Sequence, residues 1–402
     1  MIINFDPRDG VFMSINQVIV SHTALRDEFA AGKFLADEVL QKLGGSSPDV
    51  LIVFASPAFD YVALLEAIEQ GCKPAIMVGC SSAGEFSGCK DSNASASLMA
   101  IRAQDMRFNA ALGKGIGAGS TAVLDQVMPV FTGTQHSDFP YRCALVLTDA
   151  LAGYTDDMIH EMTVRTGGTY QLFGGGAADD ARFQQTHVFM GSSVHEDAVV
   201  VLEMLSKRPM GLGVRHGWQP ASEPLRVTES EGNKVISLNA VLAGDVFAAH
   251  AARTGQVFRR DDPLPFFLHN VIGIDTGDGF KLRVPLSLGE DGSVSCAAAV
   301  PVGATVRLMM ASVSSACEAA SQASRAALDG LQGARHAGSL LFDCAATRLR
   351  LGRDFGDELK AVANTLGSDN FAGCNTYGQI ARAEGQFSGF HNCTAIVCAI
   401  PE

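Results

Sequence analysis

The pattern of apolar and polar positions repeats one plan three times along the chain. Each copy opens with an apolar run of strand length, continues with apolar residues at helical spacing up to a glycine, and returns to a strand. A glycine-rich loop follows, and a further apolar strand closes the copy. The opening strands are residues 49–54, 143–147 and 339–344. We therefore predict a repeated unit of strand, helix, strand, glycine loop and strand.

The three glycine loops, residues 79–85, 174–180 and 373–379, are candidates for a binding site. Ligands of α/β sheets tend to bind beyond the carboxyl ends of strands, where these loops lie. The alternative is that each glycine only forms a tight turn at positive φ. Both interpretations stay open for any one loop. The candidate ligand-binding residues in the loops are Gly79, Cys80, Ser81, Ser82, Gly84, Glu85, Gly378 and Gln379.

The segment from about residue 210 to 311 has a different pattern, with short strand signals, several of them separated by turns. The predicted strands are residues 225–228, 234–238, 266–274, 280–288, 293–300 and 305–309. Helices are predicted at residues 23–43 and 311–331. The expected fold class is mixed α/β (α+β). The repeated units form mixed sheets covered by helices, and the middle segment is β-rich.

The chain of 402 residues is long enough for two or three domains. We predict an N-terminal domain at residues 1–209 and a C-terminal domain at residues 210–402, because Arg208-Pro209 interrupts the pattern between the second copy and the β-rich segment.

The charge balance restricts the classes of partner. The chain has 43 acidic and 30 basic residues, a formal net charge of −13. This balance argues against nucleic acid and against an anionic membrane surface. The N-terminus has no signal-peptide pattern, and no apolar run is long enough to cross a bilayer, so we expect a cytoplasmic protein.

The ten cysteines are scattered, and none forms a CxxC pair. A disulfide framework is therefore not expected, and most of these residues are interpreted as small buried side chains.

The chain resembles the FIST family, a sensory domain with N- and C-terminal halves. The resemblance rests on several motifs that occur in the same order as in that family. They are Gly79 to Glu85, Phe173 to Ala177, His216-Gly217-Trp218, Val300 to Gly303, Tyr377-Gly378-Gln379 and Phe390 to Thr394. The last motif adds Asn392 to the candidate ligand-binding residues. Gln379 stands where family members often have glutamate, so a role that needs a charge there is in doubt.

The resemblance implies an intracellular sensor of a small ligand. A chain of this length resembles the NosP-type nitric-oxide-sensing haem proteins, which implies haem b, nitric oxide and a partner histidine kinase in a two-component system. The alternative is a non-haem module that binds an amino acid or another metabolite. The oligomeric state, monomer or homo-oligomer, is left open by the sequence.

Haem needs an axial ligand, usually a neutral histidine and sometimes cysteine or tyrosine. The histidine candidates are His391, His269 and His216. His391 is also the candidate metal ligand. His269 follows an apolar run and His216 precedes Gly217-Trp218. Cys344 and Tyr377 are further candidates, and Cys344 is also interpreted as a redox thiol whose pKa is lowered by Arg348. A structural role is the competing interpretation for each residue.

No motif for an enzyme is complete, so an enzyme is not expected. The sequence contains no GxSxG, HExxH or GxxxxGK motif. A hydrolase built on Ser81 or Ser82 with Glu85 is the lower alternative. The glycine-rich run at residues 113–120 is interpreted as a turn, with anion binding at the following helix as the minor alternative.

Overall fold

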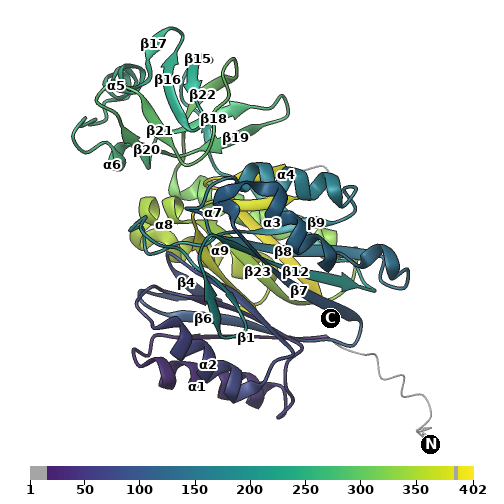
Figure 1. Ribbon diagram of the computed structural model, residues 1–402. Coiled ribbons are helices and arrows are strands. Elements are labelled where there is room, and N and C mark those ends of the chain that lie inside the picture. The colour runs from purple at the N-terminus through teal and green to yellow at the C-terminus, as the bar shows by residue number, and fades with distance from the viewer. Residues whose placement is uncertain (1–15, 384–387) are drawn as a thin grey trace, which may run out of the picture.

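Figure 1 shows the computed structural model, which describes residues 16–383 and 388–402. Three six-stranded mixed sheets form a body, and a nine-stranded sheet forms a separate β-rich lobe at the top of the view. Within the described residues, no helix is long and apolar enough to cross a membrane. The mixed sheets and the helices that cover them confirm the predicted mixed α/β fold class.

The body contains the three predicted units. Unit 1 comprises β2 (Val50–Ala55), α2 (Tyr61–Cys72), β3 (Ile76–Ser81), β4 (Glu85–Ser87), β5 (Lys90–Ser92) and β6 (Ala96–Arg102). Unit 2 comprises β8 (Tyr141–Thr148), α4 (Thr155–Arg165), β9 (Gln171–Gly176), β10 (Val188–Met190), β11 (Ser193–His195) and β12 (Ala198–Ser206). Unit 3 comprises β23 (His336–Cys344), α8 (Ala345–Leu351), α9 (Phe355–Leu366), β24 (Phe371–Thr376), β25 (Gln379–Arg382), β26 (Ser388–His391) and β27 (Ala395–Pro401).

Each unit is preceded by an edge strand and a further helix. These are β1 (Gln17–Thr23) with α1 (Glu28–Lys42), β7 (Met106–Lys114) with α3 (Ser120–Val127), and β13 (Gly211–Arg215) with α7 (Val313–Gly330). The helix predicted at residues 23–43 begins only at Glu28, because the Asp27 side chain accepts a hydrogen bond from the Ala30 amide and caps it. The lobe is inserted between β13 and α7.

The three sheets have the same strand order, and each sheet borrows a hairpin from another unit. The orders are β1-β6-β2-β3-β10-β11, β7-β12-β8-β9-β25-β26 and β13-β27-β23-β24-β4-β5. The hairpin of unit 2 thus extends the sheet of unit 1, that of unit 3 extends unit 2, and that of unit 1 extends unit 3. The predicted boundary at residue 209 stays a prediction, although strands from both sides of it share two of the sheets.

One glycine recurs at the same place in each sheet. Gly79, Gly174 and Gly373 each lie beside the preceding parallel strand on one side and the borrowed hairpin on the other. A Cβ atom added there would lie 2.0, 2.1 and 1.8 Å from the carbonyl oxygens of Val53, Val146 and Leu341, respectively. Only glycine permits this close backbone approach.

A single core lies between the three sheets, and the helices cover their outer faces. Phe54 of unit 1 and Phe342 of unit 3 meet in this core with ring centroids 5.6 Å apart. Outside it, α1 and α2 pack on the first sheet, α3 and α4 on the second, and α7 and α9 on the third. The strands between core and helices are almost fully buried, which explains their continuous apolar runs.

The lobe has its own core around Phe247 and Phe267. It contains β14 (Gln219–Pro220), β15 (Leu225–Glu231), β16 (Lys234–Leu238), β17 (Val241–Leu242), α5 (Ala243–Thr254), α6 (Leu264–Phe267), β18 (Val271–Asp275), β19 (Phe280–Arg283), β20 (Pro285–Leu288), β21 (Val294–Cys296) and β22 (Thr305–Met310). The strand predicted at residues 266–274 is wrong in its first part. A short helix that begins after Pro263 includes Phe266 and Phe267, and the strand begins at Val271.

Substitution of Gly79 by alanine tests the recurring close approach. We expect Gly79→Ala to lower the free energy of unfolding by about 1–3 kcal/mol, because its Cβ would overlap the Val53 carbonyl. Urea unfolding followed by circular dichroism measures the change. The matched control is Gly356→Ala in α9, where an added Cβ meets no atom within 4 Å. Equal stability of the two variants would contradict the packing described.

Candidate functional site

The three glycine loops meet at one end of the body. The Ala83 amide of the first loop donates to the Asn375 carbonyl (2.9 Å), and the Ala178 amide of the second donates to the Ser81 carbonyl (2.9 Å). The Tyr377 amide of the third donates to the Gly176 carbonyl at 3.0 Å. The loops therefore hold one another at the carboxyl ends of the central parallel strands, which is where α/β proteins bind ligands.

An apolar cavity of about 40 Å³ lies between these loops and the lobe. The lobe contributes Leu264, Leu268, Val284, Leu286 and Ala297, and the body contributes Phe183, Cys344, Leu349, Thr376, Tyr377 and Asn392 among others. Three of the predicted site residues, Cys344, Tyr377 and Asn392, thus line one cavity. This volume is well below the range for whole-ligand pockets, so the apolar cavity suits only a small apolar group.

A second, polar cavity of about 630 Å³ lies beside the apolar one. Its charged lining residues are Asp91, Asp180, Arg348 and Arg353, and Ala345 and Leu349 line both cavities. Arg348 pairs with Asp91 at 3.1 Å. Its guanidinium group lies over Gly84, where an added Cβ would come within 2.7 Å of it. Because Gly84 has no side chain, the Arg348 guanidinium can lie directly against it.

The first glycine loop contains a buried carboxyl group. Glu85 is fully buried, accepts a hydrogen bond from the Ser95 hydroxyl at 2.7 Å and also accepts one from the Ser82 hydroxyl. Burial raises the pKa of Glu85 to about 7, although both hydroxyls and Arg348 favour its ionised form. The Ser81 hydroxyl accepts a hydrogen bond from the His187 amide at 2.9 Å. Glu85, Ser82 and Ser95 therefore form a buried hydrogen-bonded network, and Ser81 makes its contact with His187 separately.

The remaining loop residues have structural contacts. Gln379 is buried and donates to the Thr376 hydroxyl at 2.9 Å. Gly378 allows the Phe390 ring to lie where a Cβ would be, 2.0 Å from its nearest ring atom. Cys80 is fully buried in the central core.

The second loop continues into residues 181–187 before β10 begins, and this longer connection forms part of the cavity wall through Phe183. Phe183 stacks on Tyr377 with ring centroids 4.4 Å apart and an angle of 8° between the rings. Asp179 fixes this segment, because its carboxylate accepts from the amides of Phe183 (2.8 Å) and Gln184 (2.7 Å) and from the Tyr377 hydroxyl. Asp180, Ala181 and Phe183 have positive φ angles, so the loop has a strained backbone.

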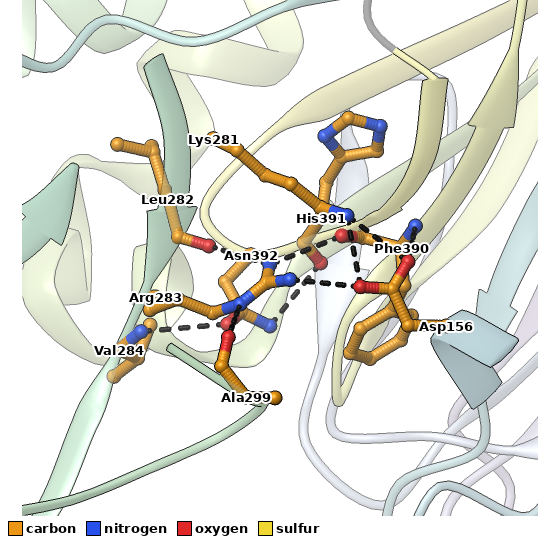
Figure 2. Close-up of polar contacts among 9 residues, drawn as sticks. All are labelled: Asp156, Lys281, Leu282, Arg283, Val284, Ala299, Phe390, His391 and Asn392. Carbon is orange, nitrogen blue, oxygen red and sulfur yellow. Dashed lines mark hydrogen bonds and ion pairs between the residues drawn. The ribbon is translucent and has the colours of Figure 1, made fainter. Parts of the chain in front are cut away.

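A cluster of charged residues joins the lobe to the body (Figure 2). Arg283 of β19, with a side chain only 2% exposed, donates to Asp156 of α4 at 3.0 Å and to the Phe390 carbonyl at 3.1 Å. Lys281 donates to the same carboxylate at 2.8 Å. Burial opposes the charge of Asp156, but Lys281 and Arg283 outweigh it and lower the pKa of Asp156. The neighbouring Val284 amide and Asn392 side chain meet at 3.4 Å, so this cluster continues to the cavity wall.

The three predicted histidine ligands do not gather at the apolar cavity. His391 is buried beside the charged cluster, and burial together with Lys281 and Arg283 lowers its pKa to about 3. In Figure 2 its ring lies beside Lys281 and points away from the hydrogen bonds around Asp156. The His216 ring lies 3.1 Å from the Phe280 carbonyl oxygen in the lobe. His269 is exposed at the end of α6. In the part of the chain that the structure describes, no group of three His, Cys, Asp or Glu residues could hold a metal ion.

Cys344 is the candidate ligand with the most distinctive surroundings. It is 4% exposed, lines the apolar cavity, and its sulfur is hydrogen bonded by the thiol of Cys393. This hydrogen bond, rather than the predicted contact with Arg348, lowers the pKa of Cys344. The other cavity-lining candidate, Tyr377, has its pKa raised by burial and by its hydrogen bond to Asp179.

The glycine-rich run at residues 113–120 is held by the chain's own carboxylates. The Gly117 amide donates to Asp197 at 2.7 Å, and the Ser120 hydroxyl at the start of α3 donates to Glu161 at 2.8 Å. The run comprises the end of β7, a short 3-10 helix at Ile116–Ala118 and the first residue of α3.

Two sequence-family models match the chain. The FIST N domain matches residues 49–241 and the FIST C domain matches residues 243–382. The chain belongs to the FIST family, whose domains are small-ligand sensory domains of signalling proteins.

The remaining comparisons add no function. No curated protein matches the sequence significantly. Among solved structures, PurL from Thermotoga maritima complexed with AMPPCP is 11% identical with a TM-score of 0.24, covering 96% of this chain and 72% of that chain. The complex of the same protein with ATP is 10% identical with a TM-score of 0.22, covering 96% and 71%. Scores this low establish no shared fold.

The buried carboxyl group of Glu85 predicts a dependence of stability on pH. Its pKa in the folded state is about 7, above that of an unfolded glutamate, so its favourable contribution is complete below about pH 4.5 and is lost as the pH rises to about 7. We expect the Glu85→Gln variant to lack this pH-dependent part of the free energy of unfolding. Its free energy of unfolding should therefore rise relative to that of wild type by roughly 1 kcal/mol per pH unit in that interval. Urea unfolding at pH 5, 6 and 7 measures the difference.

The control is Glu223→Gln, which changes an exposed carboxylate in the lobe. Its unfolding free energy should follow the wild-type pH profile. If the difference between Glu85→Gln and wild type stays constant from pH 5 to 7, Glu85 does not titrate as described.

Proposed function

We propose that this FIST protein senses a small zwitterionic metabolite of the amino-acid class, bound where the polar and apolar cavities adjoin. The observation that carries the proposal is the pairing of these two cavities, which share Ala345 and Leu349. A ligand with a charged head and an apolar side chain matches both. Pockets for such ligands combine a mostly apolar lining with a few polar groups that fix orientation.

The charges of the polar cavity suit the head of such a ligand. Arg348 and Arg353 would hold its carboxylate, and Asp91 and Asp180 would hold its ammonium group. An arginine can bind a carboxylate with two parallel hydrogen bonds. The present Arg348–Asp91 ion pair would then be exchanged for contacts with the ligand.

Occupancy of the apolar cavity would be transmitted through the lobe. Leu264 and Leu268 line the cavity from the lobe, while Tyr377 lines it from the body. A ligand that touches both parts binds best in one relative position and therefore shifts the population towards it. The Arg283–Asp156 contact lies beside the cavity wall and would act as the pivot of this change.

Binding of L-leucine and L-phenylalanine, as probes with apolar side chains, tests the proposal. We expect at least one of them to raise the Tm, and Arg348→Gln to weaken its affinity about 10–100-fold, because a charge-assisted hydrogen bond is lost. Arg353→Gln, at the exposed rim, gives a second variant with less risk to folding. Isothermal titration calorimetry measures the affinities.

Arg325→Gln, which removes an exposed arginine on α7, is the matched control and should bind like wild type. Absence of binding by both probes, or equal affinity in all three variants, would sink the proposal.

A second candidate is the haem-based nitric oxide sensor with a histidine kinase as partner, which the family resemblance implies. The apolar cavity and the Cys344 thiol that faces it favour this candidate. The three histidines do not fit, because none of them is among the residues that line the cavity. Of the candidate ligands, Cys344 and Tyr377 line the cavity, so one of them would hold the haem iron, and the bound haem would supply the coordination of nitric oxide. The cavity, at about 40 Å³, is far too small for haem as it stands, which counts against this candidate.

An absorption spectrum of the purified protein with added haemin distinguishes the two candidates. Thiolate ligation through Cys344 predicts a Soret band that shifts on addition of nitric oxide and that Cys344→Ser changes, while His391→Ala and His269→Ala leave it as in wild type. A protein that takes up no haemin would exclude the haem candidate and leave the metabolite candidate standing.

A further inference from the structure

Cys344 and Cys393 form a thiol pair at the wall of the apolar cavity. Cys344 ends β23, and Cys393 lies in the turn between β26 and β27. Both side chains belong to the same small cluster as Trp218 and Val284, at the contact between body and lobe. Cys344 faces the apolar cavity, and Cys393 lines a polar crevice on the other side.

The turn that carries Cys393 has an uncommon backbone conformation, which fixes the position of the thiol. Its φ angle is 53°, a left-handed conformation that is uncommon for residues other than glycine. The neighbouring Thr394 holds it, since its amide donates to Gln379 at 3.3 Å and its hydroxyl donates to the Asn392 carbonyl at 2.9 Å.

The two sulfurs have different chemical character. The thiol of Cys393 hydrogen bonds the sulfur of Cys344, which lowers the pKa of Cys344 and raises that of Cys393. A thiolate is the reactive form of cysteine. Cys344 lines the apolar cavity and Cys393 does not, so an oxidant that enters this cavity meets Cys344 first.

Other cysteines lack this combination. Two further close pairs, Cys80 with Cys374 and Cys143 with Cys398, lie in the central core between the sheets, where burial and the paired thiol raise the pKa of Cys374 and Cys398. Cys89 is exposed, but burial of its sulfur and the nearby Asp369 raise its pKa. Judged by exposure alone, Cys89 would be the most reactive cysteine, whereas the local contacts favour Cys344.

We propose that Cys344 and Cys393 are a site of reversible oxidation by hydroperoxides, with Cys344 as the attacking thiol and Cys393 as the resolving thiol. The cavity gives a small oxidant its path, because Phe183 and Leu349 line it and are themselves partly exposed to solvent. The site does not depend on the identity of the metabolite, but it requires that the Cys344 thiol holds no haem iron.

The chemistry proceeds in two balanced steps. The Cys344 thiolate attacks one oxygen of the hydroperoxide, an S–O bond forms, the O–O bond breaks, and the leaving alkoxide takes up a proton to become an alcohol, or water when the oxidant is hydrogen peroxide. Cys393 then attacks the sulfenic sulfur, an S–S bond forms, and the S–O bond breaks. The departing hydroxide takes up the proton of Cys393 as water. Two thiols are oxidised and one peroxide is reduced.

Such a disulfide would bind β23 to the β26–β27 turn beside Asn392, whose side chain meets the Val284 amide of the lobe. Oxidation would therefore fix the body side of the cavity wall, at the place where lobe and body touch.

Hydrogen peroxide, added in small excess to the reduced full-length protein, tests the site. Mass spectrometry of alkylated peptides then follows each cysteine over time. We expect Cys344 and Cys393 to be lost together as a disulfide, roughly tenfold faster than exposed Cys89 is modified, and to return with dithiothreitol. In Cys393→Ser, Cys344 should stop at a sulfenic acid that dimedone traps.

Cys89→Ser is the matched control and should leave the rate of disulfide formation unchanged. Oxidation of Cys89 while Cys344 stays reduced would overturn the proposal. So would a Cys393→Ser protein in which Cys344 is oxidised no further than in untreated protein. Because the wild-type rates alone decide the first outcome, the test does not require that a cysteine variant folds.

Discussion

The exchange of hairpins between the three sheets is the constraint on which the rest of this structure depends. Each hairpin completes the sheet of another unit, so no unit can form its full sheet alone. At every junction a glycine lies against a carbonyl oxygen of the neighbouring strand, at Gly79, Gly174 and Gly373. Since each hairpin starts from a glycine loop, the exchange also draws the three loops together and thereby creates the site.

The lobe gives this symmetrical body one distinct side. It is inserted in unit 3 alone, between β13 and α7, and reaches back to unit 2 through Arg283 and Asp156. A buried arginine is costly unless it is paired and hydrogen bonded, and Arg283 also donates to two carbonyls of the lobe and one of the body. Gly389 permits this contact, since an added Cβ would lie 3.0 Å from the Asp156 carboxylate. The Arg283–Asp156 contact thus helps to hold the lobe against the body beside the cavity.

Much of the body could be predicted from the sequence, because its units depend on local patterns. The apolar periods, the stop glycines and the glycine loops all lie within about forty residues of one another, and the three units appear as expected. The hairpin exchange could not be predicted, because it pairs Phe86 with Gly373 and so depends on contacts between distant residues. The helix at Leu264 was missed because its short apolar run has no period that separates helix from strand.

The candidate site was predicted in part for the same reason. The loops indicated where a ligand binds, and Cys344, Tyr377 and Asn392 do line the apolar cavity. Arg283 and Arg348 were not predicted as site residues, because their partners Asp156 and Asp91 lie far away in the sequence. The prediction of the histidines as haem ligands remains untested. Residue type alone could not show which cavity a side chain faces.

The central claim is that one small ligand binds between the glycine loops and the lobe. Hydrogen–deuterium exchange of the whole chain, with and without saturating L-leucine or L-phenylalanine, tests it most directly. The account predicts slower exchange together in residues 177–187, 344–349 and 264–268, with little change in α1 and α2. Protection confined to α1 and α2, or to the lobe without the loops, would contradict it.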